Sequence, residues 1–181
     1  MGEPDSAWTD AIRKGRVLTY YNGANVGKWA GIVDLAAQAF NRIPDSLVTY
    51  KKVKDKASAN VEVCVTKERS VDFEFEGEKQ DPIVLGSLVH GRTRTVRRDQ
   101  GIEKAKCVLP LETAESEKNH LIFIAAHELL HATGLAEHTN DGLLMSAPNM
   151  FDGKIFASAD AKRMPPLFLG PKAASRMAAI W

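Results

Sequence analysis

The segment HELLHATG, from His127 to Gly134, is the strongest indication of fold in this 181-residue chain. Within it, His127 and His131 are four residues apart, so on a helix they stand about one turn apart on the same face. Two imidazoles placed in this way can both reach one zinc ion, at a distance of about 2.0–2.1 Å. Glu128 lies further round the helix. Its carboxylate is therefore predicted to be a general base, taking a proton from a water whose pKa zinc lowers from about 15.7 to near 7.

The residues around this segment favour a zinc site over a chance match to a short pattern. The helix that carries it is the most apolar in the sequence, with Leu121, Ile122, Ile124, Ala125, Leu129 and Leu130. Two histidines and a glutamate in such a helix are costly to bury unless something engages them. We therefore expect one catalytic Zn²⁺ at this helix.

The longer segment HELLHATGLAEH, from His127 to His138, resembles the metzincin clan of zinc endopeptidases. The pattern of that clan is H-E-x-x-H-x-x-G-x-x-H, followed by a methionine turn. Gly134 matches the glycine of the pattern, and we expect it to leave the helix with a positive φ. Downstream, LLMSAP looks like the methionine turn, most like that of the matrixins. The resemblance implies that Met145 lies beneath the zinc without binding it.

The sequence departs from the family at the third zinc ligand. The family position of the third histidine is occupied by Glu137, and His138 follows one residue later. We predict that His138 is the third ligand, because imidazole suits zinc and the loop after Gly134 can absorb one extra residue. Glu137 and Asp141 stay open as alternatives. His120 is expected to cap the helix or face solvent, and His90 to be structural.

The rest of the chain predicts an α+β fold. Strands are expected at residues 17–21, 47–53, 60–66, 83–89 and 106–111, and helices at about 26–42, 116–134 and 171–181. This order suggests a metzincin-like N-terminal lobe of mixed β-sheet with two long helices, about residues 1–134. A small irregular C-terminal lobe, about residues 135–181, would hold the methionine turn and the terminal helix. The 181 residues would then form a single zinc-peptidase catalytic domain.

Two details of these strands can be checked directly. Pro110 suits an edge position for the strand at 106–111, because proline cannot donate to a strand ladder. A basic stretch follows Gly91, and such a stretch usually forms a solvated edge strand or a loop. Its four arginines are Arg92, Arg94, Arg97 and Arg98.

Composition limits the classes of partner. The formal net charge is +1, from 24 basic and 23 acidic residues, which gives no support to nucleic-acid or membrane binding. With 44% hydrophobic residues the chain can build a core without disulfides. Cys64 and Cys107 read as small buried hydrophobes, and the sequence leaves open whether they pair. Residues 1–10 contain no apolar segment typical of a secretory signal. Neither location nor oligomeric state is predicted.

The predicted activity is endopeptidase cleavage of protein or peptide substrates, with an extended substrate pairing to an edge strand, Lys106–Leu111 or Ile83–Val89. A gluzincin-like site would need a downstream glutamate, and none follows Glu137. An aspzincin-like site could use Asp141 or Asp152. A non-catalytic zinc module, or a peptidase relative that has lost activity, is the alternative outside enzymes, although a structural site would use four protein ligands and no neighbouring base.

Overall fold

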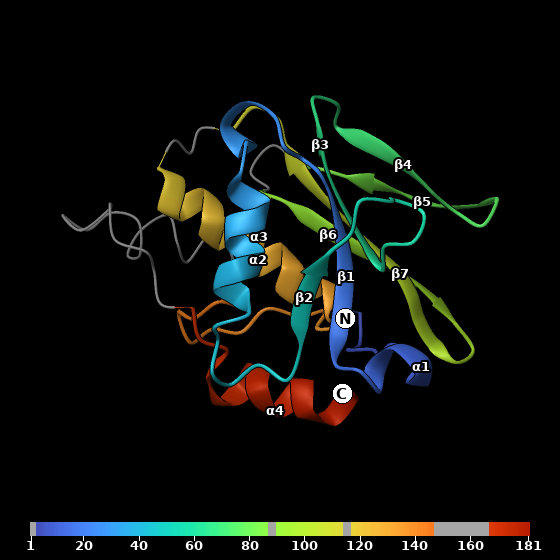
Figure 1. Ribbon diagram of the computed structural model, residues 1–181, viewed down its shortest axis with the longest axis vertical. Coiled ribbons are helices and arrows are strands. Elements are labelled where there is room, and N and C mark those ends of the chain that lie inside the picture. The colour runs from blue at the N-terminus through green and yellow to red at the C-terminus, as the bar shows by residue number, and fades with distance from the viewer. Residues whose placement is uncertain (1–2, 87–89, 114–116, 147–166) are drawn as a thin grey trace.

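A five-stranded sheet forms the centre of the computed structural model, which describes residues 3–86, 90–113, 117–146 and 167–181 (Figure 1). The strand order is β2-β1-β3-β7-β6, in which β6 runs antiparallel to β7 and the other neighbours are parallel. The strands are β1 Val17–Gly23, β2 Thr49–Lys52, β3 Val61–Thr66, β6 Arg92–Arg98 and β7 Gly101–Pro110. This mixed, mostly parallel sheet with helices is consistent with the expected α+β class. The metzincin-like architecture and its two lobes stay a prediction.

The two faces of the sheet bury different clusters, because successive side chains of a strand point to opposite faces. On one face, Val63 of β3 and Cys107 of β7 belong to the main core. On the other face, Val108 packs in a smaller cluster with Phe73 and Ile83. These two come from a hairpin formed by β4 (Ser70–Phe75) and β5 (Glu78–Val84). Each face is thus covered by its own layer.

Two helices, α2 (Ile32–Phe40) and α3 (Lys118–Ala132), pack against each other and contact the sheet (Figure 1). The Tyr50 hydroxyl of β2 donates a 2.5 Å hydrogen bond to the carbonyl of Leu129 in α3. Most of α3 is buried, which explains why its apolar residues run all round the helix. This buried helix carries the HELLH segment into the centre of the molecule.

Both chain ends dock at the end of α3, where helix carbonyls lack partners within the helix. The Trp8 indole donates to the carbonyl of Ala132, and the Trp181 indole donates to that of Thr133, each at 2.9 Å. Trp181 follows α4 (Gly170–Ile180), and Trp8 precedes the short helix α1 (Asp10–Arg13). Segments near both ends of the chain therefore satisfy carbonyl groups at the end of α3.

The predicted helix at 26–42 is interrupted. A 3₁₀ turn, η1 (Gly27–Trp29), is followed by Gly31 with φ +73°, and α2 begins only at Ile32. The left-handed conformation of Gly31 breaks the regular helix, so apolar residues at helical spacing span two elements rather than one. The helix also ends at Phe40, before Pro44.

The edge assignment of the strand at 106–111 was wrong. Those residues belong to β7, which lies inside the sheet between β3 and β6. Pro110 is tolerated because it is the last residue of β7, and its carbonyl accepts a hydrogen bond from the Trp29 indole. The arginine-rich stretch was expected to form either a solvated edge or a loop. It forms β6, which is an edge strand of the sheet. The strand predicted at 83–89 ends at Val84, as the end of β5, and residues 87–89 lie outside the described chain.

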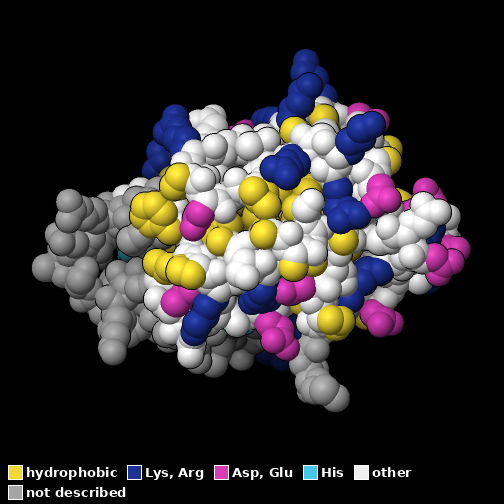
Figure 2. All heavy atoms as spheres, turned by 90° about the horizontal axis from the view of Figure 1, so that it is seen from below, with side chains coloured by type: hydrophobic (Ala, Val, Ile, Leu, Met, Phe, Trp, Pro, Cys, Tyr) yellow, Lys and Arg dark blue, Asp and Glu magenta, His cyan; other side chains and the backbone are white. Residues whose placement is uncertain are grey.

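Cys64 and Cys107 do not pair with each other and are both free cysteines, Cys107 buried and Cys64 partly exposed. Among the described residues, no helix is both long and apolar enough to cross a membrane. The face seen in Figure 2, viewed from below Figure 1, carries acidic and basic side chains interspersed. A surface of this kind creates no extended field of one sign.

Candidate metal centre

Helix α3 holds His127, Glu128 and His131 close to the centre of the protein. His127 is 3% exposed and Glu128 is 4% exposed, and the side chains between and around them are part of the main core. A polar group buried this deeply needs a partner. The partners of these three residues therefore indicate what the site can do.

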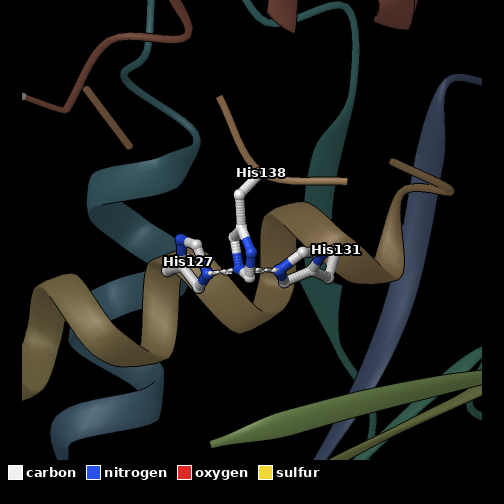
Figure 3. Close-up of side chains that lie close together, drawn as sticks. All are labelled: His127, His131 and His138. Atoms are coloured by element: carbon white, nitrogen blue, oxygen red, sulfur yellow. Dashed lines mark hydrogen bonds between the residues drawn. The ribbon is translucent and has the colours of Figure 1, made fainter. Parts of the chain in front are cut away.

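Gly134 turns the chain back toward the helix. Its φ of +110° lies in the region that only glycine adopts readily, and it follows Thr133, the C-cap of α3, so the positive φ expected from the sequence is confirmed. The returning loop brings His138 to the two helical histidines (Figure 3). The Nε2 atoms of His127, His131 and His138 lie 3.1 Å from one another in all three pairs. The extra residue relative to the metzincin pattern is thus accommodated in the loop.

The hydrogen bonds on the outer side of two rings fix their tautomers. Nδ1 of His127 lies 2.5 Å from the carbonyl oxygen of Leu144, and Nδ1 of His131 lies 2.8 Å from that of Leu135. A carbonyl can only accept, so both Nδ1 atoms must carry the proton. In a neutral imidazole the Nε2 atom is then left with its lone pair. These lone pairs point into the centre of the cluster.

Burial keeps the rings neutral. Desolvation, followed by the other histidines, holds the pKa of His127 well below its usual value. Desolvation also lowers the pKa of His131 to about 4, against the opposing hydrogen bond to Leu135. The pKa of His138 is lowered too, by burial and by Arg176. Neutral imidazole is the form that binds metals. Facing lone pairs repel one another, and a shared cation removes that repulsion.

The geometry fits a single metal ion. The three histidines are close enough to bind one ion together. A regular tetrahedral zinc site would separate its nitrogens by about 3.3–3.4 Å, given zinc–nitrogen distances of about 2.0–2.1 Å. The observed 3.1 Å separations are a few tenths of an ångström shorter. The hydrogen bonds to Leu144 and Leu135 are the outer contacts that orient metal-binding histidines.

The alternative ligands are placed elsewhere. Glu137 is exposed and does not belong to the histidine cluster. Asp141 accepts hydrogen bonds from Thr139 and Ser146 and from the backbone amide of Leu143, which gives it a structural part in the following turn. Asp152 lies outside the described residues. His120 is buried, at 3% exposure, so the expectation that it faces solvent was wrong.

Met145 lies in a turn directly beside this cluster. The turn is closed by a 2.9 Å hydrogen bond from the amide of Ser146 to the carbonyl of Leu143. Met145 is fully buried, and the preceding carbonyl of Leu144 is the one that orients His127. The amide of Thr139, next to His138, donates to the Met145 carbonyl at 2.8 Å. The turn therefore links two of the three histidines, while Pro148 of the predicted motif lies outside the described residues.

Glu128 is held by β6. The Thr93 hydroxyl lies 2.6 Å from the carboxylate oxygen Oε2 of Glu128. Gly91 leaves room for this side chain, since a Cβ there would come within 2.8 Å of the Glu128 Cγ atom. Burial raises the pKa of Glu128 to about 7, although the Thr93 hydrogen bond and Arg92 act in the opposite direction. A carboxylate with a pKa near neutrality is well matched to proton transfer at physiological pH.

A cleft of about 560 Å³ opens over these groups. One wall is β6, and the other contains Glu128 and His131 of α3 together with the loop that carries His138. A substrate in this cleft would meet the histidine cluster and the Glu128 carboxylate together. Sequence reasoning missed Thr93, because nothing in the local pattern connects it to a residue 35 positions away.

An N-terminal segment, Glu3–Ser6, fastens the loop of His138, and sequence reasoning missed it as well. The Asp5 carboxylate accepts a 2.9 Å hydrogen bond from the amide of Ala136. It also accepts two from the Arg176 guanidinium of α4, at 2.7 and 2.6 Å. The Ser6 backbone packs so closely on Gly134 that a Cβ there would lie 2.0 Å from the Ser6 carbonyl oxygen. Gly134 is thus required both by its φ and by this contact.

We expect Asp5→Ala to weaken metal binding without removing any of the three histidines. Losing the carboxylate frees the loop that presents His138 and leaves the Arg176 guanidinium without its partner. Outer contacts of metal ligands typically contribute about 10–100-fold in affinity, and we expect the lower end here. Competition with a fluorescent zinc chelator measures the effect. Asp10→Ala is the matched control, since the Asp10 side chain is exposed and, in the part of the chain that the structure describes, forms an ion pair with Arg13 alone. Equal affinities for the two variants would contradict this part of the account.

Comparison of the chain with protein-family models found no match, and comparison with curated proteins found none either.

Proposed function

We propose that this protein is a zinc-dependent endopeptidase. The observation that carries the proposal is the buried Glu128 carboxylate in the wall of an open cleft that also contains His131 and His138 of the histidine cluster. A general base beside three imidazole ligands is the arrangement that hydrolytic zinc sites use. The resemblance of residues 127–145 to the metzincin pattern supports the same activity.

Zinc is the metal that we propose for the three histidines. Imidazole nitrogen suits zinc, and catalytic zinc sites commonly use three protein ligands in tetrahedral geometry. The described residues provide three ligands and no fourth at this cluster. The remaining position would then be available to water, as in catalytic rather than structural sites.

In the proposed reaction, bound zinc would make water acidic enough to lose a proton at neutral pH and would polarise the scissile carbonyl. The Glu128 carboxylate accepts that proton as the water oxygen attacks the carbonyl carbon. The same carboxyl group then donates the proton to the leaving nitrogen as the peptide bond breaks. Thr93 keeps the carboxylate in position through its 2.6 Å hydrogen bond, and the carbonyls of Leu144 and Leu135 keep the imidazoles aligned.

The free edge of β6 is the place for an extended substrate. Of the two strands expected to serve, β7 is paired on both sides inside the sheet, and Ile83–Val84 belongs to the hairpin strand β5. β6 instead lines the cleft and, among the described residues, pairs in the sheet only with β7. Its unpaired backbone groups can add a peptide strand, and pairing of this kind accepts many sequences.

Incubation with an unfolded protein, followed by mass spectrometry of the fragments, tests the proposal. We expect internal cuts throughout the substrate, because a peptide paired along β6 can extend beyond the cleft at both ends. Glu128→Gln protein is the control for contaminating proteases. If single residues were released from a chain end with no internal cut, the endopeptidase assignment would be wrong.

A non-catalytic zinc module is the second candidate. It would explain the histidine cluster, but it gives no reason to bury Glu128 beside the ligands or to leave a cleft open over them. A gluzincin-like site lacks its glutamate, because no glutamate follows Glu137 in the sequence. Of the two aspartates open to an aspzincin-like site, Asp141 is engaged in the turn and Asp152 lies outside the described residues. The catalytic three-histidine site is therefore favoured.

A further inference from the structure

Two arginines of β6, Arg94 and Arg97, form a pair in the wall of the cleft. Residues three apart point to opposite faces of a regular strand, and at the register shift between β6 and β7 the extra residue, Glu103, belongs to β7. Irregularities of this kind increase the local twist of a strand. The two long side chains nevertheless bring their guanidinium groups to the same carboxylate, that of Glu3.

The chain's own Glu3 carboxylate is held between them. Arg94 donates to Oε1 of Glu3 at 2.8 Å, and Arg97 donates to Oε2 at 3.3 Å. The arginine side chains are 32% and 33% exposed, whereas that of Glu3 is 59% exposed. The arginines are therefore built into the cleft wall, while the carboxylate rests on them from the solvent side. Exposed ion pairs of this kind contribute little stability and exchange readily.

Among the described residues, Glu3 is the only carboxylate that forms an ion pair with Arg94 or Arg97. The Nε–H group of Arg94 is buried, so a ligand would bind a terminal nitrogen of this guanidinium, as Glu3 does. The third arginine of the cleft, Arg92, is turned toward the hairpin, where it donates to the Val84 carbonyl. Arg98 is engaged outside the cleft, with Glu76 and Glu103. Arg94 and Arg97 are thus the pair left to meet a ligand.

We infer that Arg94 and Arg97 form a subsite for an acidic side chain of the substrate, and that Glu3 occupies this subsite in the free protein. Guanidinium groups bind carboxylates with charge-assisted hydrogen bonds, which are stronger than neutral ones. That the ligand is a peptide substrate rests on the proposed peptidase function. That the ligand carries a carboxylate follows from the contact of the two arginines with Glu3.

The position of the subsite relative to the cleaved bond follows from the direction of β6. Thr93, which bonds Glu128, precedes Arg94 and Arg97 along this strand. A peptide antiparallel to β6 runs in the opposite sense, so the residues that pass the two arginines lie N-terminal to those beside Glu128. Each strand residue advances about 3.3 Å and faces one partner residue. The acidic residue should fall about one to four positions before the cleaved bond.

A cleavage experiment tests the position. An unfolded protein is digested with the zinc-loaded protein, and the residues before each cut are identified by mass spectrometry. We expect Asp and Glu to be enriched at these positions for the unaltered protein and for Arg98→Ala, which lies outside the cleft. The double variant Arg94→Ala/Arg97→Ala should lose the enrichment while still cutting neutral sequences. Enrichment that persists in the double variant would overturn the inference.

A binding experiment separates this inference from the peptidase proposal. Zinc-loaded Glu128→Gln protein is titrated into two pools of labelled, end-blocked peptides. One pool contains Asp and Glu, and the other has the same sequences with Asn and Gln in their place. We expect about tenfold tighter binding of the acidic pool, as charge-assisted hydrogen bonds typically provide. Glu3→Gln should increase this preference, because it removes the competing carboxylate, and the double arginine variant should abolish it. Equal binding of both pools overturns the inference, whereas preference without any cleavage overturns only the peptidase proposal.

Discussion

Glu128→Gln is expected to abolish peptide hydrolysis while the protein stays folded and keeps its metal. Glutamine has the same shape as glutamate, so it can still fill the space beside Gly91 and accept the Thr93 hydrogen bond. It cannot accept a proton from water. General-base catalysis typically contributes about 10²–10⁴-fold, and we expect a loss of that order in kcat/KM. Initial rates with an unfolded protein substrate measure it, together with zinc content and thermal unfolding.

Glu137→Gln is the matched control for this variant. Glu137 is a carboxylate on the same loop as His138, but it is exposed and lies outside the histidine cluster. It should retain the activity of the unaltered protein. A Glu128→Gln variant that hydrolyses the substrate at a comparable rate would show that Glu128 is not the base, even if the metal site is correct.

The second large effect concerns the third ligand. His138→Ala should lower the affinity for zinc by at least about 100-fold. Changing a residue that only hydrogen-bonds to a metal ligand typically lowers it by about 10–100-fold, and the loss of a ligand itself should be larger. The reason is that the Nε2 atom of His138 completes the triangle with His127 and His131 at 3.1 Å. His138 is also more exposed than the other two, so its removal should affect the fold less than a change in α3. Zinc content after dialysis against a weak chelator measures the loss.

Glu137→Ala is the decisive comparison for the ligand assignment, because Glu137 holds the position of the third histidine in the metzincin pattern. This variant should keep its zinc. If Glu137→Ala lost metal and His138→Ala kept it, the assignment would be reversed, although His127 and His131 would still stand as a pair.

The local features of the site could be predicted from the sequence because they depend on short-range spacing. A separation of four residues places His127 and His131 on one helix face, and a glycine with positive φ turns the chain at Gly134. The placement of His138 in the cluster also agrees with the prediction, since a loop can absorb an extra residue. The same holds for strands such as β1 and β3, whose residues alternate between two faces.

The remaining features depend on contacts between residues far apart in the sequence. Thr93 reaches Glu128 across 35 positions, and Asp5 reaches Arg176 across 171. Neither residue belongs to a pattern that local spacing reveals. The order of strands in the sheet also depends on such contacts, because β7 lies inside the sheet only once β3 and β6 have paired on either side of it. Pro110 therefore suggested an edge, although it only marks the end of that strand.

The central claim is that a metal held by His127, His131 and His138 is required for peptide hydrolysis. The most direct measurement removes all metal with a chelator, then adds zinc in steps and follows both cleavage of an unfolded protein and bound zinc. Our account predicts no cleavage by the metal-free protein and full recovery at one zinc per chain, with no recovery in Glu128→Gln. Undiminished cleavage by the metal-free protein, or no cleavage by the zinc-loaded protein, would contradict it.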